Sequence, residues 1–147
     1  AHDWAHVLHR YQHTTAHSDY GIDASTQLGV PPVRVFKTLV VETDSHELLV
    51  ACVPVTDRLH TKSLAAAAGA KKVFMADGAL VEKTTGYVLG GVSPLGQKKP
   101  LRTFIDASAQ SFDTVFVSGG RRGLEIELAP SDLTALTQAT YASLYDR

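Results

Sequence analysis

The chain has 147 residues, a hydrophobic fraction of 44%, a charged fraction of 20% and a formal net charge of -1. A chain of this length is expected to form a single domain over residues 1–147 with a sizeable core. Its one cysteine excludes an intrachain disulfide framework, and no apolar run approaches the roughly 20 residues of a membrane span. The composition therefore predicts a cytoplasmic protein that contacts no membrane and meets any nucleic acid through a local basic patch.

The N-terminal segment carries His2, His6, His9 and His13, at spacings of four, three and four residues. On a helix these side chains would form one stripe, and neutral imidazoles at positions i and i+4 can share a metal ion. The same pattern is also typical of the wet face of an amphipathic helix. No cysteine or paired carboxylate joins the group, so neither a metal site nor a cofactor is predicted.

Two strands rich in Val and Leu follow, at residues 33–43 and 46–55, joined by a tight turn at residues 43–45. Every second residue from Val33 to Val41 lies on one strand face, and Lys37 is the only charged member of that face. Burying an unpaired ammonium group costs several kcal/mol. Lys37 is therefore expected to face a cavity or an anion, or else to extend from a strand end or pair with a structural carboxylate.

The rest of the chain reads as short strands separated by short helices. Leu124, Ile126 and Leu128 alternate with Glu125 and Glu127, which is the pattern of a strand with two distinct faces. Consecutive strands with few helices between them favour an α+β fold, a strongly curved mixed sheet or partial barrel flanked by helices. The predicted helices span 61–69, 77–86 and 131–144, and the predicted strands span 71–76, 101–106, 113–120 and 123–129.

Standard catalytic motifs are missing from the sequence. There is no G-x-S-x-G nucleophile elbow, and no glycine-rich phosphate loop follows a strand. Cys52 lies in the middle of LLVACVPV, where a small core residue is expected rather than a nucleophile.

Two glycine-rich loops, GGVSPLGQKK at 90–99 and VSGGRRG at 117–123, stand out instead. Glycine allows close backbone approach, so such loops can aim N–H groups at a carbonyl or carboxylate oxygen, although each is also compatible with an ordinary turn. Basic residues flank both loops and indicate contact with phosphate, unless they form only a solvated face. These residues are Lys98, Lys99, Arg102, Arg121 and Arg122.

The stretches FKTLVV, AGAKKVFMAD, TGYVLGGVSPLGQKK and VSGGRRGLEIELAP, in this order and spacing, resemble the YbaK-type Cys-tRNA(Pro) deacylases. These free-standing proteins are related to the editing domain inserted in bacterial prolyl-tRNA synthetases. The resemblance runs from about Tyr11 to the last helix. It implies a mixed β-barrel flanked by helices, and a strand near AHVLHRY in place of a histidine-bearing helix.

The resemblance also implies residue roles. Lys37, Gly90 and Gly91 are expected to be catalytic, and Glu125 stands where aspartate is expected in close relatives. Lys98, Lys99, Arg121 and Arg122 border the glycine loops and are expected to contact tRNA. The expected substrate-binding residues are Tyr11, Tyr20, Thr38, Val92, Ser93, Pro94 and Ser118.

The activity implied is trans-editing of the mischarged tRNA that prolyl-tRNA synthetase makes when it attaches cysteine. Cys-tRNA(Cys) is a further implied substrate. Binding alone discriminates poorly between small side chains of similar size, so a second site removes the wrong amino acid. The implied partners are the acceptor end of tRNA(Pro) and the synthetase, but not DNA. Two alternatives remain at this point: a deacylase for Ala-tRNA(Pro) or a broader set, and a non-catalytic module that binds tRNA or a synthetase.

Overall fold

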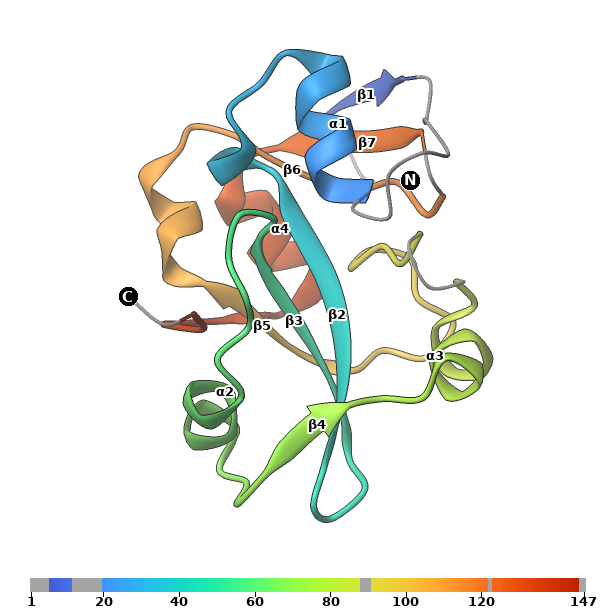
Figure 1. Ribbon diagram of the computed structural model, residues 1–147, viewed down its shortest axis with the longest axis vertical. Coiled ribbons are helices and arrows are strands. Elements are labelled where there is room, and N and C mark those ends of the chain that lie inside the picture. The colour runs from blue at the N-terminus through green and yellow to red at the C-terminus, as the bar shows by residue number, and fades with distance from the viewer. Residues whose placement is uncertain (1–5, 12–19, 88–90, 122, 146–147) are drawn as a thin grey trace.

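The computed structural model describes residues 6–11, 20–87, 91–121 and 123–145. Within them the chain forms two sheets with short helices around them (Figure 1). The predicted α+β class and the mixed sheet are confirmed. The strands divide between two sheets and do not close into a barrel in the part of the chain that is described.

The larger sheet has the strand order β4-β2-β3-β5-β8. β2 pairs antiparallel with both β3 and β4, whereas β5 runs parallel to β3 and to β8. The β2–β3 hairpin supplies the long central strands of this sheet, as the Val- and Leu-rich runs predict. The strands are β2 (Phe36–Thr43), β3 (Leu48–Pro54), β4 (Val73–Met75), β5 (Arg102–Asp106) and β8 (Thr140–Ala142).

The smaller sheet is antiparallel, in the order β1-β7-β6, with β1 at His6–Arg10, β7 at Leu124–Leu128 and β6 at Val115–Ser118. The strand implied near AHVLHRY is thus confirmed, and the histidine-bearing helix is wrong. In a strand, His6 and His9 are three residues apart and point to opposite faces, so they cannot form a stripe. Within the described residues, no group of three or more histidine, cysteine or acidic side chains is arranged to hold a metal ion.

The helices are α1 (Tyr20–Leu28), α2 (Thr61–Ala68), α3 (Gly78–Thr85) and α4 (Pro130–Thr137), with 3-10 turns at Pro32–Arg34 (η1) and Ala107–Ser111 (η2). Two of them end as their sequence predicts. Gly69 and Gly86 adopt left-handed backbone angles, φ 75° and 84°, which stop α2 and α3. The Asp77 side chain caps α3 by accepting a hydrogen bond from the amide of Ala79 at 3.1 Å.

The structure corrects two predicted boundaries and adds one helix. The strand predicted from Val33 begins at Phe36, because the preceding prolines set a 3-10 turn over Pro32–Arg34. The helix predicted to reach Leu144 stops at Thr137, since Gln138 turns left-handed at φ 55° and Thr140–Ala142 then pairs with β5 as a parallel strand. Helix α1 was not predicted from the sequence.

The core lies on both faces of the β2–β3 hairpin. One face packs against the smaller sheet and carries Phe36, Val40 and Cys52, together with Val117 and Leu128. The other face packs against α2. A third cluster joins the two sheets, with Val35, Val55 and Phe116 buried beneath Leu28 and Val30. No helix in the described part of the chain is long and apolar enough to cross a membrane.

Candidate functional site

Lys37 lies at the beginning of β2, where that strand leaves the smaller sheet. It is half-buried, and among the described residues it takes part in no ion pair or hydrogen bond. By strand alternation it shares a face with Val35 and Leu39, as predicted from the sequence. An ammonium group that is half-buried and unpaired is available to a ligand.

Val35, the residue before β2, forms an isolated parallel bridge with Phe116 of β6. Lys37 and Ser118 each lie two residues beyond that bridge. Because strand side chains alternate, each shares the face of its bridge residue. The structure therefore brings Lys37 and Ser118 to the same side of the molecule, where the two sheets separate.

Glu125 lies directly opposite Ser118 on the neighbouring strand β7, so both side chains share one face of the smaller sheet. Only 6% of Glu125 is exposed, and among the described residues no hydrogen bond or ion pair involves its carboxyl group. This burial raises the pKa of Glu125 to about 8. Carboxyl groups whose pKa is strongly raised by burial are concentrated at functional sites.

The basic groups nearest to Glu125 along the sheet are engaged elsewhere. His9 is its partner on β1, yet the His9 Nε2 atom lies 2.8 Å from an oxygen of Glu127. Arg34 bonds Thr114 and also reaches Glu127 at 3.4 Å. The Thr114 hydroxyl, followed by His9 and Arg34, lowers the pKa of Glu127. Glu127 therefore binds both His9 and Arg34, and neither of these side chains bonds to Glu125.

The two glycine loops predicted from the sequence lie against each other. A Cβ atom on Gly91 would meet the Cα atom of Arg121 at 3.1 Å, so the backbones touch at this point. Tyr87 joins the same loops: its ring packs where a Gly120 side chain would stand, and its hydroxyl donates a 2.6 Å hydrogen bond to the carbonyl of Leu95. The loops thus form one unit beside the start of β2.

The first of these loops lies on the side of β2 opposite β3, next to the end of α3 (Figure 1). Gly91, Val92, Ser93 and Pro94 are buried, and Val92 belongs to the core cluster that contains Phe36. No hydrogen bond among the described residues uses the N–H groups of Gly91, Val92 or Ser93. Amide groups that are buried and unused can stabilise a developing oxyanion.

The two loop serines hold the backbone in place. The Ser93 hydroxyl accepts a hydrogen bond from the amide of Leu95 at 3.2 Å, and the Ser118 hydroxyl accepts one from Gly120 at 3.1 Å. Each bond closes a local turn of the kind that serine favours. Each hydroxyl retains its proton for donation to another acceptor.

Thr38 and Cys52 face the core, on the side of β2 away from Lys37. The Thr38 hydroxyl lies 4.0 Å from the Cys52 sulfur atom. Complete burial raises the pKa of the Cys52 thiol to about 12. Cys52 therefore stays protonated at neutral pH and is inert as a nucleophile, as its place in the sequence predicts.

Residues 18–136 match the model of the aminoacyl-tRNA editing domain. The chain belongs to this editing-domain family. A protein of Enterococcus faecalis named as a candidate Cys-tRNA(Pro)/Cys-tRNA(Cys) deacylase, EbsC, is 42% identical over 117 residues, which make up 80% of this chain and 71% of that protein. A proline--tRNA ligase of Brachyspira hyodysenteriae is 28% identical over 91 residues, which make up 62% of this chain and 16% of the ligase.

Solved structures share the editing-domain fold. One of them, described as a candidate trans-editing enzyme for prolyl-tRNA synthetase, superposes with a TM-score of 0.86 and 23% identity. The match covers 97% of this chain and 87% of that one. The mixed arrangement of strands and short helices is therefore the fold of this family.

Some residues predicted for the editing site lie outside the described part of the chain. These are Gly90, Arg122 and the side chain of Tyr20, whose backbone begins α1. Tyr11 follows β1, where its amide donates a 3.0 Å hydrogen bond to the carbonyl of Gly123. Its backbone is thus anchored at the end of the second glycine loop.

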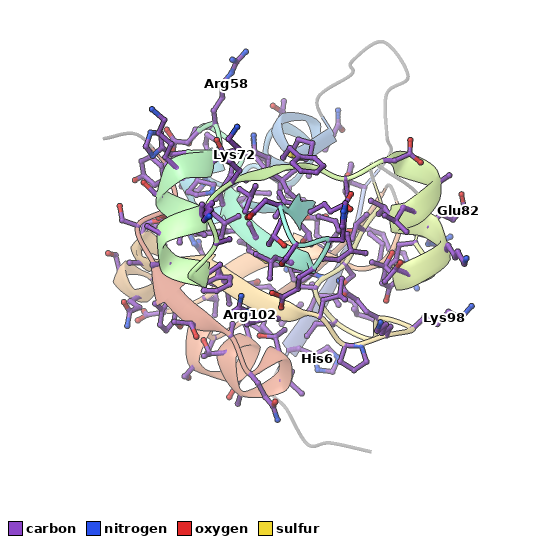
Figure 2. All side chains as sticks on the ribbon, turned by 90° about the horizontal axis from the view of Figure 1, so that it is seen from below. His6, Arg58, Lys72, Glu82, Lys98 and Arg102 are labelled. Carbon is purple, nitrogen blue, oxygen red and sulfur yellow. The ribbon has the colours of Figure 1, made fainter. Side chains whose placement is uncertain are left out.

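The basic residues predicted for this editing domain are exposed. Lys98 and Lys99 follow the first glycine loop and Arg121 lies in the second. Lys98 is held at the end of α3, because its amide donates a 2.9 Å hydrogen bond to the carbonyl of Thr85. Its side chain projects away from the body of the molecule (Figure 2).

Tyr87 was not among the predicted site residues, and the sequence marks Glu125 only as standing where the resemblance leads us to expect aspartate. Tyr87 carries no signal in the sequence beyond its place before GGVSPLG, because its role depends on contacts with a loop more than 30 residues away. For Glu125, the sequence pattern alone does not reveal that the side chain is buried, and this becomes clear only when its strand partners are known. The alternation in LEIEL places it on a face with Glu127, but only the register opposite Ser118 shows that this face is buried there.

Proposed function

We propose that this protein is an aminoacyl-tRNA deacylase that removes cysteine from mischarged Cys-tRNA(Pro), and also acts on Cys-tRNA(Cys). Membership in the editing-domain family and the name of the 42%-identical relative support this substrate class. One structural observation carries the proposal. An unpaired, half-buried Lys37 begins the strand that lies beside a buried glycine loop with unused amide groups.

The proposed reaction uses the substrate's own thiol. The cysteinyl sulfur attacks the ester carbonyl carbon, a carbon–sulfur bond forms, and the bond from that carbon to the terminal ribose oxygen breaks. The thiol proton ends on the ribose hydroxyl, so the products are a cyclic thiolactone and uncharged tRNA. The protein supplies attack geometry and stabilises the oxyanion of the tetrahedral intermediate.

Named groups of the site fit these tasks. The amides of Gly91, Val92 and Ser93 supply hydrogen-bond donors for the oxyanion. Lys37 holds the terminal phosphate or ribose oxygen by charge. No side chain has to act as a nucleophile, which agrees with a Cys52 thiol whose pKa is raised to about 12.

The partners follow from the substrate. A single-stranded acceptor end enters between the glycine loops and β2, with Lys98, Lys99, Arg121 and Arg122 next to its phosphates. Prolyl-tRNA synthetase produces the mischarged tRNA, and we propose that the protein works beside it. The relation to a proline--tRNA ligase supports this association.

A deacylation assay with Lys37→Ala tests the proposal. We expect turnover of Cys-tRNA(Pro) to fall by about 100-fold with an unchanged fold, the order expected for loss of one key electrostatic contact. Lys62→Ala is the matched control, because Lys62 is exposed on α2. A folded Lys37→Ala protein with wild-type turnover would contradict the role of Lys37. Comparing Cys-, Ala-, Ser- and Pro-charged tRNA(Pro) then identifies the amino acid.

A further inference from the structure

The carboxyl group of Glu125 has no role in the mechanism above, yet Glu125 is the more deeply buried of the two glutamates on the face of β7 that lies opposite Ser118. The residue is only 6% exposed. Burying a carboxyl group without a hydrogen-bond partner is unfavourable, so its presence needs a reason. A ligand that completes its hydrogen bonds would supply that reason.

The charged groups around Glu125 do not supply a partner. On β1 the facing side chain is His9, which bonds Glu127; on β7 the next residue of the same face is Glu127 itself. Lys37 of β2 lies toward the same side of the molecule, and it forms no ion pair with Glu125 among the described residues. Among the described residues, no cation is therefore placed to ionise this carboxyl group.

An aminoacyl ester carries one cation close to its reacting carbonyl, namely the α-ammonium group. We propose that Glu125 receives the α-ammonium group of the substrate, so that the site accepts aminoacyl-tRNA with a free amino group and rejects tRNA whose amino group is acylated. This inference rests on the proposed function. It extends that function to a selectivity for the amino end of the substrate, independent of the side chain.

Pairing of the α-ammonium group with Glu125 should change the number of protons that Glu125 holds. Burial keeps Glu125 protonated at neutral pH, since its pKa is about 8. At pH 6.5 an α-amino group with an ordinary pKa of about 7.7–8.0 is protonated too. Formation of an ammonium–carboxylate pair then releases the Glu125 proton to solvent. Binding of a substrate analogue should release close to one proton per site.

The test uses tRNA(Pro) whose terminal 3′-oxygen is replaced by NH, so that cysteine is joined through an amide that resists cleavage. One probe has a free amino group and the other is N-acetylated. We expect wild type to bind the free form at least about 10-fold more tightly, as for a hydrogen bond to a charged group. Glu125→Gln should bind both forms alike, and Glu82→Gln, an exposed change on α3, should behave as wild type.

Calorimetry at pH 6.5 in buffers of different ionisation enthalpy counts the protons. Wild type should release about one proton on binding the free form, and Glu125→Gln should release none. Equal affinity of wild type for both probes, or no proton release, overturns the inference while deacylation of Cys-tRNA(Pro) still stands. Failure of wild type to bind or deacylate any charged tRNA overturns the proposed function itself. If Glu125→Gln does not fold, the two-probe comparison on wild type and Glu125→Asp decides the matter.

Discussion

Gly91 illustrates how one small residue holds the site together. A Cβ atom at this position would approach the Cα of Arg121 to 3.1 Å, a contact that only a shift of backbone could relieve. Gly91 lies outside the left-handed region, so the requirement for glycine there comes from the neighbouring loop and not from its own backbone angles. The contact between the two glycine loops is therefore tight, and a side chain at this position would force the neighbouring backbone to shift by a few tenths of an ångström.

We predict that Gly91→Ala lowers deacylation by about 10- to 100-fold, because the loop amides move away from the developing oxyanion. Its melting temperature should fall only slightly. Gly69→Ala is the informative counterpart: nothing lies within 4 Å of that position, but its φ of 75° strains any side chain. That variant should lose about 1 kcal/mol of stability and keep its activity. Full activity in a folded Gly91→Ala protein would contradict the loop contact.

The sequence allows part of this residue-scale picture to be predicted. Strand periodicity places Lys37 with Val35 and Leu39, and the core position of Cys52 follows from its apolar neighbours. The state of Glu125 cannot be read in the same way. It depends on which strands lie beside β7 and on the engagement of His9 by Glu127, and neither is encoded in local spacing.

At the scale of elements, hydrophobic period and capping residues predict the β2–β3 hairpin, α2, α3 and β7. The elements that the sequence does not predict correctly are those whose structure depends on pairing with strands far away in the sequence. Thr140–Ala142 continues an apolar helical pattern after α4, yet it forms a strand because β5 offers a free parallel edge. Likewise, the N-terminal histidines have helical spacing, but pairing with β7 makes His6–Arg10 a strand.

In the proposed function, the two touching glycine loops act as a single element that presents basic side chains to the substrate. Lys98 projects outward at the end of α3 (Figure 2), and Arg121 touches the first loop through its backbone. A single-stranded acceptor end that reaches Lys37 would pass these side chains. Their contribution to binding should therefore depend on salt, because each phosphate contact releases condensed counterions.

We predict that replacing both Lys98 and Arg121 by alanine weakens tRNA binding and flattens the slope of log affinity against log salt by up to about 1.4, or about 0.7 per single-stranded phosphate contact. The matched control replaces Arg58 and Lys72, two exposed basic residues that Figure 2 shows on the other side of the molecule from Lys98. It removes the same charge and should leave the slope unchanged. Equal slopes for both double variants would mean that the tRNA follows another path.

At the scale of the whole molecule, two glutamates on β7 give opposite contributions to stability as pH changes. The Thr114 hydroxyl lowers the pKa of Glu127, so its stabilisation is present above the ordinary glutamate pKa and is lost as pH falls through the lowered value. Burial raises the pKa of Glu125 from 4.5 to about 8. Between these values the folded protein binds more protons than the unfolded chain, so its stability declines as pH rises.

We predict that Glu125→Gln is more stable than wild type at pH 7–8 and that the difference disappears near pH 4.5. Glutamine mimics the protonated carboxyl group and does not titrate. The free energy of unfolding of the variant should therefore lack the decline, up to about 1.4 kcal/mol per pH unit, that Glu125 causes between its unfolded and folded pKa values. Urea unfolding of wild type, Glu125→Gln and Glu82→Gln at pH 4.5 and at each pH unit from 5 to 8 measures this difference. The Glu82→Gln curve should run parallel to wild type, because Glu82 is exposed. If the Glu125→Gln curve also runs parallel, Glu125 is ionised in the folded protein. A variant that gains stability while losing preference for a free amino group would instead show that the buried carboxyl group is kept for binding, at the expense of stability.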